Sequence, residues 1–365
     1  MKYISAAIGL GAILVAALAA PGEQWNQEWK LKPSRTTDRV HFRIERSKWR
    51  NNWSTSRDVP LSRFRGLSPE TLARNGRVRF EYVHDAGRLI CEGSLWSGSG
   101  SGSFTFTIDS GFVAELKHLG YEEPDGDQII SILMTDVDLP FAHGVRKRVP
   151  DATTRQLIEL SIHGVTLDYL REAEEAGYRN LGAKDFVEMR IHGVSTAFLR
   201  DLKASGYDLA PREAVELRIH GVTSEFVRDL KQAGYDLPAK QITELRIHGV
   251  NSAYLQELRR YGLQPEARGL VELRIHGVSP EFLKELKDAG YSGLSNKEIT
   301  ELRIHGVQPD FIRDAKSLGY SFTTKELVEL RIHGVSGSYL KKLRDTGFKN
   351  LTASQIAKLK IHGID

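Results

Sequence analysis

Eight histidines recur at a nearly constant interval from residue 163 to residue 362, each within the sequence Ile-His-Gly. Consecutive histidines are 28 or 29 residues apart, at His163, His192, His220, His248, His276, His305, His333 and His362. An imidazole can bind a metal ion, change its charge near neutral pH, or hydrogen-bond a neighbouring group. The row therefore leaves three kinds of chemistry open.

The spacing of the histidines disfavours a metal site. Packed helices lie about 8–10 Å apart, whereas zinc needs ligand atoms about 2 Å away on all sides. With one histidine in each copy the imidazoles cannot converge, so we expect no metal and no cofactor. A pH-responsive row stays open as an alternative. The favoured interpretation is structural, with each histidine capping a helix and bonding a glutamate such as Glu244, four residues before His248.

An arginine stands two positions before most of these histidines. The arginines are Arg190, Arg218, Arg246, Arg274, Arg303 and Arg331. With neighbouring glutamates they predict surface ion pairs, so we interpret both rows as structural candidates. The chain contains no His-Glu-x-x-His helix, Gly-x-Ser-x-Gly elbow or phosphate-binding loop, and we therefore expect no catalytic residues.

The elements that position these rows are pairs of short helices. In residues 278–307, Ser279 is an N-cap followed by proline, and Gly290 ends the first helix. Ser295 and Glu298 form the capping box of a second helix, which ends at the histidine. Helices of about ten residues are unstable alone, so the copies must stack.

The predicted fold class is α+β, a small β-rich N-terminal domain followed by an α-solenoid. The solenoid covers residues 109–365 with about nine two-helix repeats of 28–29 residues. Residues 151–365 form its regular part. Residues 109–150 form degenerate first units, because Pro140, Gly144 and Pro150 argue against a regular helix there.

Residues 20–108 do not repeat and carry the predicted strands. Apolar alternation marks residues 40–46, 78–83, 89–96 and 103–108 as strands. His84-Asp-Ala-Gly87 predicts a hairpin turn, and Ser68 predicts the start of a short helix. The glycine- and serine-rich residues 97–103 predict a flexible loop.

Five tryptophans and one cysteine also fall within the front domain. The tryptophans are Trp25, Trp29, Trp49, Trp53 and Trp96, and they either form its core or line a carbohydrate or peptide groove. We favour the core. Cys91 is the only cysteine, so an internal disulfide is impossible, and a buried inert thiol is expected rather than a reactive one.

The first residues predict export. Lys2 precedes an apolar run over residues 4–20, and Ala17-Leu-Ala19 offers small residues before a cleavage point, so residues 1–19 are typical of a signal peptide. An uncleaved N-terminal anchor is the alternative. Either way we expect a periplasmic or secreted protein. Basic residues exceed acidic ones by only four, and we expect no nucleic-acid partner.

The repeats also resemble a known family. Glu-Leu-Arg-Ile-His-Gly-Val-Ser-Pro-Glu-Phe (272–282) resembles repeats in the soluble extracytoplasmic tails of bacterial membrane metallopeptidase sensors, which are related to β-lactam-sensing receptors. Asp58-Val-Pro-Leu-Ser62, Gly66-Leu-Ser-Pro-Glu70 and Gly100-Ser-Gly-Ser-Phe-Thr-Phe106 resemble the domain before those repeats. The multi-span membrane part and the zinc-peptidase motif are missing here. The resemblance thus implies an exported interaction or sensory role without peptidase activity.

Together these patterns favour an exported bacterial interaction or scaffold protein that is not an enzyme. We expect its helical-repeat surface to bind a protein, a peptide or a cell-envelope component, and we expect a monomer that touches membrane only through an uncleaved anchor. One alternative is a cell-wall-active or other hydrolytic enzyme with its site in the N-terminal domain. Another is a pH-responsive sensory module.

The export prediction is tested by sequencing the mature N-terminus. We expect a chain that begins near Ala20 in the envelope fraction, because the apolar run and the small residues before it match a cleavable signal. Full-length protein recovered from the cytosol would contradict this.

Overall fold

The computed structural model describes residues 26–48 and 51–364. The predicted signal peptide, Trp25 and Trp49 lie outside the described residues. The chain divides into two compact units, one ending at Ile191 and one beginning at His192. We describe each unit by itself.

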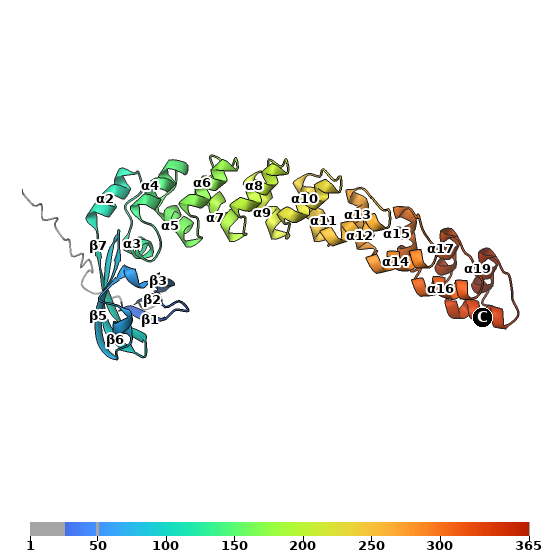
Figure 1. Ribbon diagram of the computed structural model, residues 1–365, viewed down its shortest axis with the longest axis horizontal. Helices are drawn as coiled ribbons and strands as arrows, with labels where there is room; N and C mark the ends of the chain where they lie inside the picture. The colour runs from blue at the N-terminus through green and yellow to red at the C-terminus, as the bar shows by residue number, and fades with distance from the viewer. Residues whose placement is uncertain (1–25, 49–50, 365) are drawn as a thin grey trace, which may run out of the picture. The chain divides into compact units, whose positions relative to one another are not determined.

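The first unit contains a seven-stranded antiparallel sheet with the order β3-β2-β1-β7-β6-β5-β4 (Figure 1). The strands are β1 (Asn26–Pro33), β2 (Arg39–Lys48), β3 (Asn51–Pro60), β4 (Phe64–Arg65), β5 (Gly76–His84), β6 (Gly87–Trp96) and β7 (Ser99–Ile108). A short helix, α1 (Pro69–Leu72), begins after the N-cap Ser68 as predicted. The predicted turn after His84 joins β5 to β6, which confirms the hairpin. The sequence analysis did not predict β1, β3 or β4.

The sheet curls around an aromatic core. Phe42 on β2 and Phe64 on β4 lie near opposite ends of the strand order, yet their ring centroids are 5.3 Å apart. Phe80 and Tyr82 on β5 lie 6.2 and 5.7 Å from the same Phe42 ring. All four rings are buried, so the concave side of the sheet is filled by side chains.

The predicted glycine–serine loop is wrong, because most of that segment is strand β7. Trp29 on β1 is fully buried, and its indole N–H donates to the carbonyl of Glu92 at 3.1 Å. A Cβ on Gly93 would lie 2.7 Å from the indole, and one on Gly100 would lie 3.1 Å from it. Gly102 pairs directly with Trp29 across the strands. The glycines therefore make room for the indole ring.

The described tryptophans differ in burial. Trp29 belongs to the core, Trp53 is half-buried, and Trp96 is 73% exposed at the end of β6. The core interpretation is therefore confirmed only for Trp29. Cys91 is buried beside Phe80, and burial raises the pKa of its thiol. The prediction of a buried thiol is confirmed.

Helices follow the sheet in a repeated arrangement, which confirms the α+β class with a helical-repeat region. The first unit holds α2 (Ser110–His118), α3 (Gly126–Leu133), α4 (Leu139–Arg148), α5 (Thr154–Ile162), α6 (Leu167–Glu175) and α7 (Ala183–Ile191). The second unit holds α8 (Thr196–Ala204), α9 (Pro211–Ile219), α10 (Ser224–Gln232), α11 (Ala239–Ile247), α12 (Ser252–Arg260), α13 (Ala267–Ile275), α14 (Pro280–Asp288), α15 (Asn296–Ile304), α16 (Pro309–Ser317), α17 (Thr324–Ile332), α18 (Gly337–Asp345) and α19 (Ala353–Ile361).

Within the second unit the helices form two layers. The odd-numbered helices α9 to α19 pack against one another in order, and so do the even-numbered helices α8 to α18. Figure 1 shows the two layers exchanging their upper and lower places between α10 and α17, so the stack twists. Phe226, Leu230 and Leu245 are examples of the buried apolar residues between the layers.

The helix boundaries follow the predicted caps. Ser279 accepts from the backbone N–H of Phe282, and Ser295 with Glu298 completes the capping box. Gln308 is the exception in the N-cap column, since its side chain makes no cap bond. Gly290 has a φ of +82°, as predicted for a residue that ends a helix in the left-handed conformation.

The alternation between 28- and 29-residue repeats has a local cause. The three longer intervals each contain one additional left-handed residue, at Asn180, Gly293 and Asn350, with φ values of 58°, 72° and 59°. All three lie between the two helices of a pair. An extra residue there forms a tighter turn, so the helices on either side keep their lengths.

The prediction of an irregular segment at residues 139–150 is wrong, because α4 is a regular ten-residue helix. Asp138 caps it, and Pro140 lies in the first turn, where a missing backbone N–H is tolerated. A Cβ on Gly144 would lie 2.4 Å from the side chain of Leu167 on α6. Gly144 therefore allows close approach of α6 and does not break the helix.

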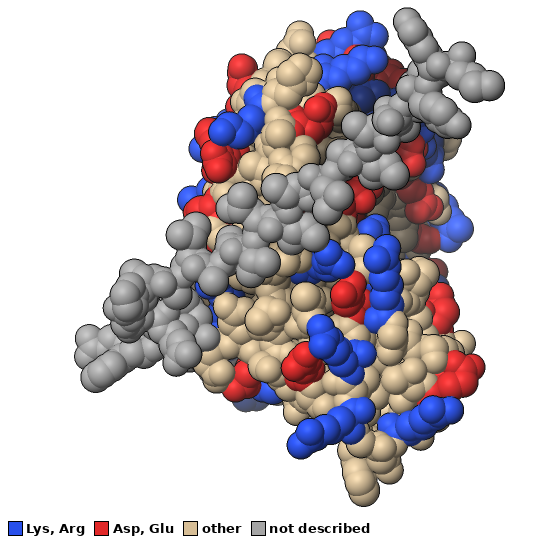
Figure 2. Space-filling view, turned by 90° about the vertical axis from the view of Figure 1, so that its left-hand side faces the viewer, with Lys and Arg blue, Asp and Glu red and all other residues tan. Residues whose placement is uncertain are grey.

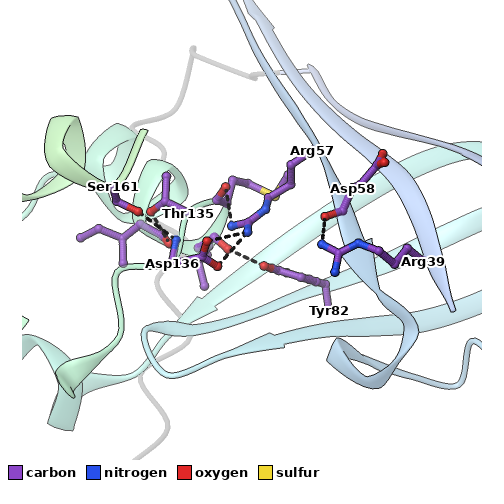
Figure 3. Close-up of polar contacts among 10 residues, drawn as sticks. Arg39, Arg57, Asp58, Tyr82, Thr135, Asp136 and Ser161 are labelled. Atoms are coloured by element: carbon purple, nitrogen blue, oxygen red, sulfur yellow. Dashed lines mark hydrogen bonds and ion pairs between the residues drawn. The ribbon is translucent and has the colours of Figure 1, made fainter. Parts of the chain in front are cut away.

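Polar contacts join the sheet to the first helices (Figure 3). Arg57 on β3 donates to Asp136 at 2.7 Å and to the carbonyl of Met134, the C-cap of α3, at 3.3 Å. The hydroxyl of Tyr82 donates to the carbonyl of Leu133 at 2.8 Å. Both side chains thus satisfy carbonyls at the end of α3 that the helix itself leaves unbonded.

The outer side of the sheet is covered by charges of both signs. Lys30 pairs with Glu45 at 3.1 Å and Arg79 with Glu92 at 3.4 Å, and Figure 2 shows basic and acidic side chains interspersed over the face in view. Among the described residues, no helix has the length and hydropathy needed to cross a bilayer.

His84 gives the first unit a predicted pH dependence. Its Nδ1 accepts from the backbone N–H of Ala86 at 3.1 Å, and the side chain is 5% exposed. Burial, assisted by the charge of Arg63, lowers the pKa of His84 from 6.5 to about 4. The folded state therefore keeps the imidazole neutral at a pH where the unfolded state is protonated.

Acidification should consequently destabilise the first unit. The free energy of unfolding has its full value above pH 6.5, where the His84 imidazole is neutral in both the folded and the unfolded state. It falls as the pH drops towards 4, by about 2 kcal/mol at pH 5, because only the unfolded state binds the proton there. Denaturant unfolding of the wild type and of His84→Leu at pH 7 and pH 5 measures it, because the variant cannot titrate there. Equal pH dependence in the two proteins would contradict the assignment.

Candidate functional surface on the repeats

The arginine of the repeat lies in the joint between consecutive helix pairs. In the second unit, the guanidinium carbon of Arg218 on α9 lies 5.2 Å from the centroid of the Phe198 ring on α8, the first helix of the same pair. Its Nε donates to the carbonyl of Gly193 at 3.2 Å, and its Nη1 donates to the carbonyl of Val222 at 3.0 Å. One side chain therefore contacts an aromatic ring and two helix ends.

The same contacts recur at the other joints. Arg331 lies 5.5 Å from the Phe311 ring and donates to the carbonyls of Gly306 and Val335 at 3.1 and 2.9 Å. The remaining guanidinium–ring distances are 5.1 Å for Arg190–Tyr169 in the first unit, and 5.1 Å for Arg246–Phe226, 4.8 Å for Arg274–Tyr254 and 4.7 Å for Arg303–Phe282 in the second. Arg274 and Arg303 also bond the carbonyls of His248 and His276, each at 3.4 Å.

The predicted surface ion pairs of these arginines are therefore corrected. In the second unit each of these guanidinium groups is directed at an aromatic face and at one or two backbone carbonyls that end helices, where a cation meets the negative end of the helix dipole. At one joint the glycine also makes room for the arginine, because a Cβ on Gly249 would lie 3.0 Å from Arg274. Arginine is suited to this place because its planar fork can donate in several directions at once.

The histidines are C-cap residues, as predicted, but they do not form the predicted row of hydrogen bonds with glutamate. His248 has φ −86° and ψ 11° at the end of α11, and its backbone N–H donates to the carbonyl of Glu244. Among the described residues, one imidazole of the row lies near a glutamate, with 3.5 Å between His220 Nε2 and Glu216 within one helix. The imidazoles of His163, His192, His333 and His362 are exposed, and the other four are half-buried.

The isoleucine before each histidine is exposed, although it belongs to a helix whose other apolar residues are buried. In the second unit the exposed fractions are 54% for Ile219, 58% for Ile247, 58% for Ile275, 52% for Ile304, 56% for Ile332 and 58% for Ile361. We call these six residues and the histidines that follow them the isoleucine–histidine row. In the first unit Ile162 and Ile191 are 60% and 56% exposed.

The sequence analysis missed these isoleucines as surface residues. The signal was present in helical spacing, since Ile304 lies two residues after the buried Leu302 and five after the buried Ile299. Those offsets place it away from the apolar stripe, on the same face as Lys297 and Glu301. An exposed large apolar residue repeated in every copy is informative in a way that a single one is not.

Metal binding and acid–base catalysis have less structural support in the described part of the chain than binding through the exposed row. No three His, Cys, Asp or Glu side chains of residues 26–48 and 51–364 come together as metal ligands would. A hollow of about 590 Å³ beside the sheet is lined by His84, Arg88 and Asp109 among others. Asp109 accepts from the backbone N–H of Phe112 at 2.8 Å, and His84 accepts from Ala86. The acid and the imidazole are each engaged by backbone rather than by one another.

Comparisons with known proteins add no relative. The chain matches no protein-family model, no curated protein and no solved structure. The resemblance to metallopeptidase-sensor tails therefore rests on the quoted motifs and remains a prediction.

The geometry predicts a small role for the histidine side chains in stability. His276→Gln should change the free energy of unfolding by about 1 kcal/mol or less, because the imidazole makes at most one net hydrogen bond. The purified protein should hold no stoichiometric zinc, and a chelator should leave its melting temperature unchanged. Elemental analysis and thermal melts with and without chelator measure this, and a chelator-sensitive melt would contradict it.

Proposed function

We propose that this chain is an exported bacterial binding protein without catalytic activity, and that its repeats bind a protein or cell-envelope partner through the isoleucine–histidine row. The periplasm or the cell exterior is the proposed location. The proposal is carried by one observation, which is that the copies keep an exposed isoleucine unchanged, followed by an unchanged exposed or half-buried histidine, although the contacts of the fold do not require the exposed side chain.

The constant residues of the repeat differ in what they contact. The arginine bridges two helix ends, the glycine adopts positive φ, and the following valine, such as Val250, is fully buried. These three residues are explained by folding. The isoleucine and the histidine are identical in all eight copies, yet the isoleucine is more than half exposed in each.

Other exposed positions change from copy to copy. The position of Arg228 on α10 is occupied by Gln256 on α12 and by Lys284 on α14, and all three side chains are exposed. Solvent-exposed positions tolerate such exchange because they carry little of the folding energy. Invariance at an exposed apolar position is therefore best explained by a partner that covers it.

The first unit supports the absence of catalysis. Aromatic side chains fill the concave side of the sheet, and the imidazole and carboxylate near its edge are used by backbone groups. A hydrolytic site needs an acid and a base within hydrogen-bond reach of a common point. The closest imidazole–carboxylate pairs described in this unit, His41–Asp58 at 2.9 Å and His143–Glu115 at 3.0 Å, lie on its surface with the imidazoles about half exposed, and the hollow beside the sheet holds no such pair.

The experiment compares capture of envelope components by three proteins. The three baits are the wild type, an isoleucine variant and a matched control. The isoleucine variant carries Ile247→Ser, Ile275→Ser and Ile304→Ser. The control carries Arg228→Ser, Gln256→Ser and Lys284→Ser on the even-numbered helices. We expect the isoleucine variant to lose the captured partner and the control to keep it. Both should melt within a few degrees of the wild type, because each changed side chain is at least half exposed or lies on the surface.

Contact is tested by cross-linking. A photoreactive residue replacing Ile275 should cross-link the partner, whereas one replacing Gln256 should not. Equal capture by all three proteins, or equal cross-linking from both positions, would contradict the proposed surface.

A further inference from the structure

A pocket lies within the repeats of the second unit. Its volume is about 200 Å³, and its lining comes from the end of α12, from α14 and from the start of α15. The buried side chains of Leu263, Leu283, Leu286 and Ile299 form its apolar wall. An apolar cavity of about 150 Å³ can hold a benzene ring, so this pocket has room for one aromatic ring.

One exception in the repeat accounts for the pocket. In the second unit, the residue after the glycine that ends each even-numbered helix is aromatic in five of the six pairs, at Tyr207, Tyr235, Tyr291, Tyr320 and Phe348. In the sixth pair this residue is Leu263. Leucine has no ring, so the space that an aromatic side chain occupies in the other pairs stays open beside α14.

The tyrosines of the pairs on either side show what the equivalent space holds. The hydroxyl of Tyr235 donates to the carbonyl of Pro265 at 2.6 Å, and the hydroxyl of Tyr291 donates to the carbonyl of Phe322 at 2.5 Å. Each acceptor directly precedes the N-cap of the odd-numbered helix in the following pair. Leu294 has this place before α15 and lines the pocket. Within residues 26–48 and 51–364, its carbonyl accepts no hydrogen bond.

An unpaired ammonium group also lies at the pocket. The Nζ of Lys287 is 5.8 Å from the centroid of the Tyr261 ring, and both residues line the pocket. This ammonium group makes no hydrogen bond or ion pair with the described residues, whereas that of Lys316, at the same position on α16, bonds a carbonyl of the preceding pair. Arg260, the other cation of the lining, is paired with Glu257 at 2.5 Å.

We propose that this pocket binds a small phenol that carries a carboxylate. The ring fills the apolar space, the hydroxyl donates to the carbonyl of Leu294, and the carboxylate pairs with Lys287. The charge of Lys287 favours a free acid over the tyrosine of a partner protein, because the peptide backbone beside a tyrosine is uncharged. The lining contains no residue of the isoleucine–histidine row, so the inference does not rest on the proposed function.

Titration calorimetry of the whole mature protein tests each contact with a matched probe. The acid 4-hydroxyphenylacetate should bind about tenfold more tightly than phenylacetate, which lacks the hydroxyl, and about tenfold more tightly than p-cresol, which lacks the carboxylate. The uncharged N-acetyltyrosinamide represents the tyrosine of a partner, and it should bind no more tightly than p-cresol.

The variants locate the binding. Leu263→Tyr restores the ring of the neighbouring pairs and should abolish binding of 4-hydroxyphenylacetate, whereas Leu263→Met adds no ring and should keep it. Lys287 is exposed, so Lys287→Ala tests the site even if Leu263→Tyr does not fold. It should weaken binding of the acid about tenfold and leave binding of p-cresol unchanged.

Three results would overturn the inference: no binding of 4-hydroxyphenylacetate, equal affinity for this acid and phenylacetate, or full binding in folded Leu263→Tyr. Tighter binding of N-acetyltyrosinamide would overturn it as well, since the occupant would then be a side chain of a partner. The Ile247→Ser, Ile275→Ser, Ile304→Ser protein should bind the acid like the wild type, because its changed residues lie outside the pocket. The site and the proposed function can therefore fail independently.

Discussion

The repeat region depends on one contact, the arginine that lies between consecutive helix pairs. A nine-residue helix such as α11 is too short to persist alone, and its end leaves carbonyls without partners. Arg218 and Arg331 each donate to a carbonyl at the end of the preceding pair and to one at the end of their own, while lying over an aromatic ring of their own pair. A single arginine side chain therefore satisfies carbonyls at two helix ends and also packs on an aromatic ring. The glycine that recurs beside the arginine is required by its own left-handed conformation, with a φ of +75° at Gly249.

The same contact explains why the isoleucine–histidine row is free for another use. The arginine, glycine and valine of the repeat provide the stacking contacts, so the two remaining constant residues are not needed between helix pairs. Because the joint is repeated, it also places Ile247 and Ile275 in equivalent positions on adjacent helices. A periodic binding surface thus follows directly from a periodic stacking contact.

The sequence predicted the repeat unit well because its signals are local. The caps at Ser279 and Ser295 and the left-handed Gly290 depend only on neighbouring backbone, and the structure has them where the pattern placed them. The wrong predictions concern segments whose conformation depends on residues that are distant in the sequence. Strand β7 is rich in glycine because Trp29 on another strand lies against it, and Gly144 stands in α4 because Leu167 approaches it.

The candidate surface was only half predictable for the same reason. The histidine and arginine rows could be found from spacing, but the groups that they contact could not. The partner of Arg274 is a ring on Tyr254 and a carbonyl of His248, twenty or more residues away, and no local pattern specifies it. In the sequence, only the offset of each isoleucine from the buried apolar positions of its helix indicates that it is exposed. The neighbouring helices in the structure show which face is covered, and they leave the isoleucine outside it.

A double-mutant cycle between Phe226 and Arg246 tests the central claim most directly. Their guanidinium–ring distance is 5.1 Å, and Arg246 also donates to the carbonyl of Val250 at 3.1 Å. Unfolding of Phe226→Leu, Arg246→Ala and the double variant should give a coupling free energy of about 1 kcal/mol, as expected for a partly desolvated cation over a ring. Additive losses, with no coupling, would show that the arginine does not hold the two helices of its pair together in the way the structure indicates.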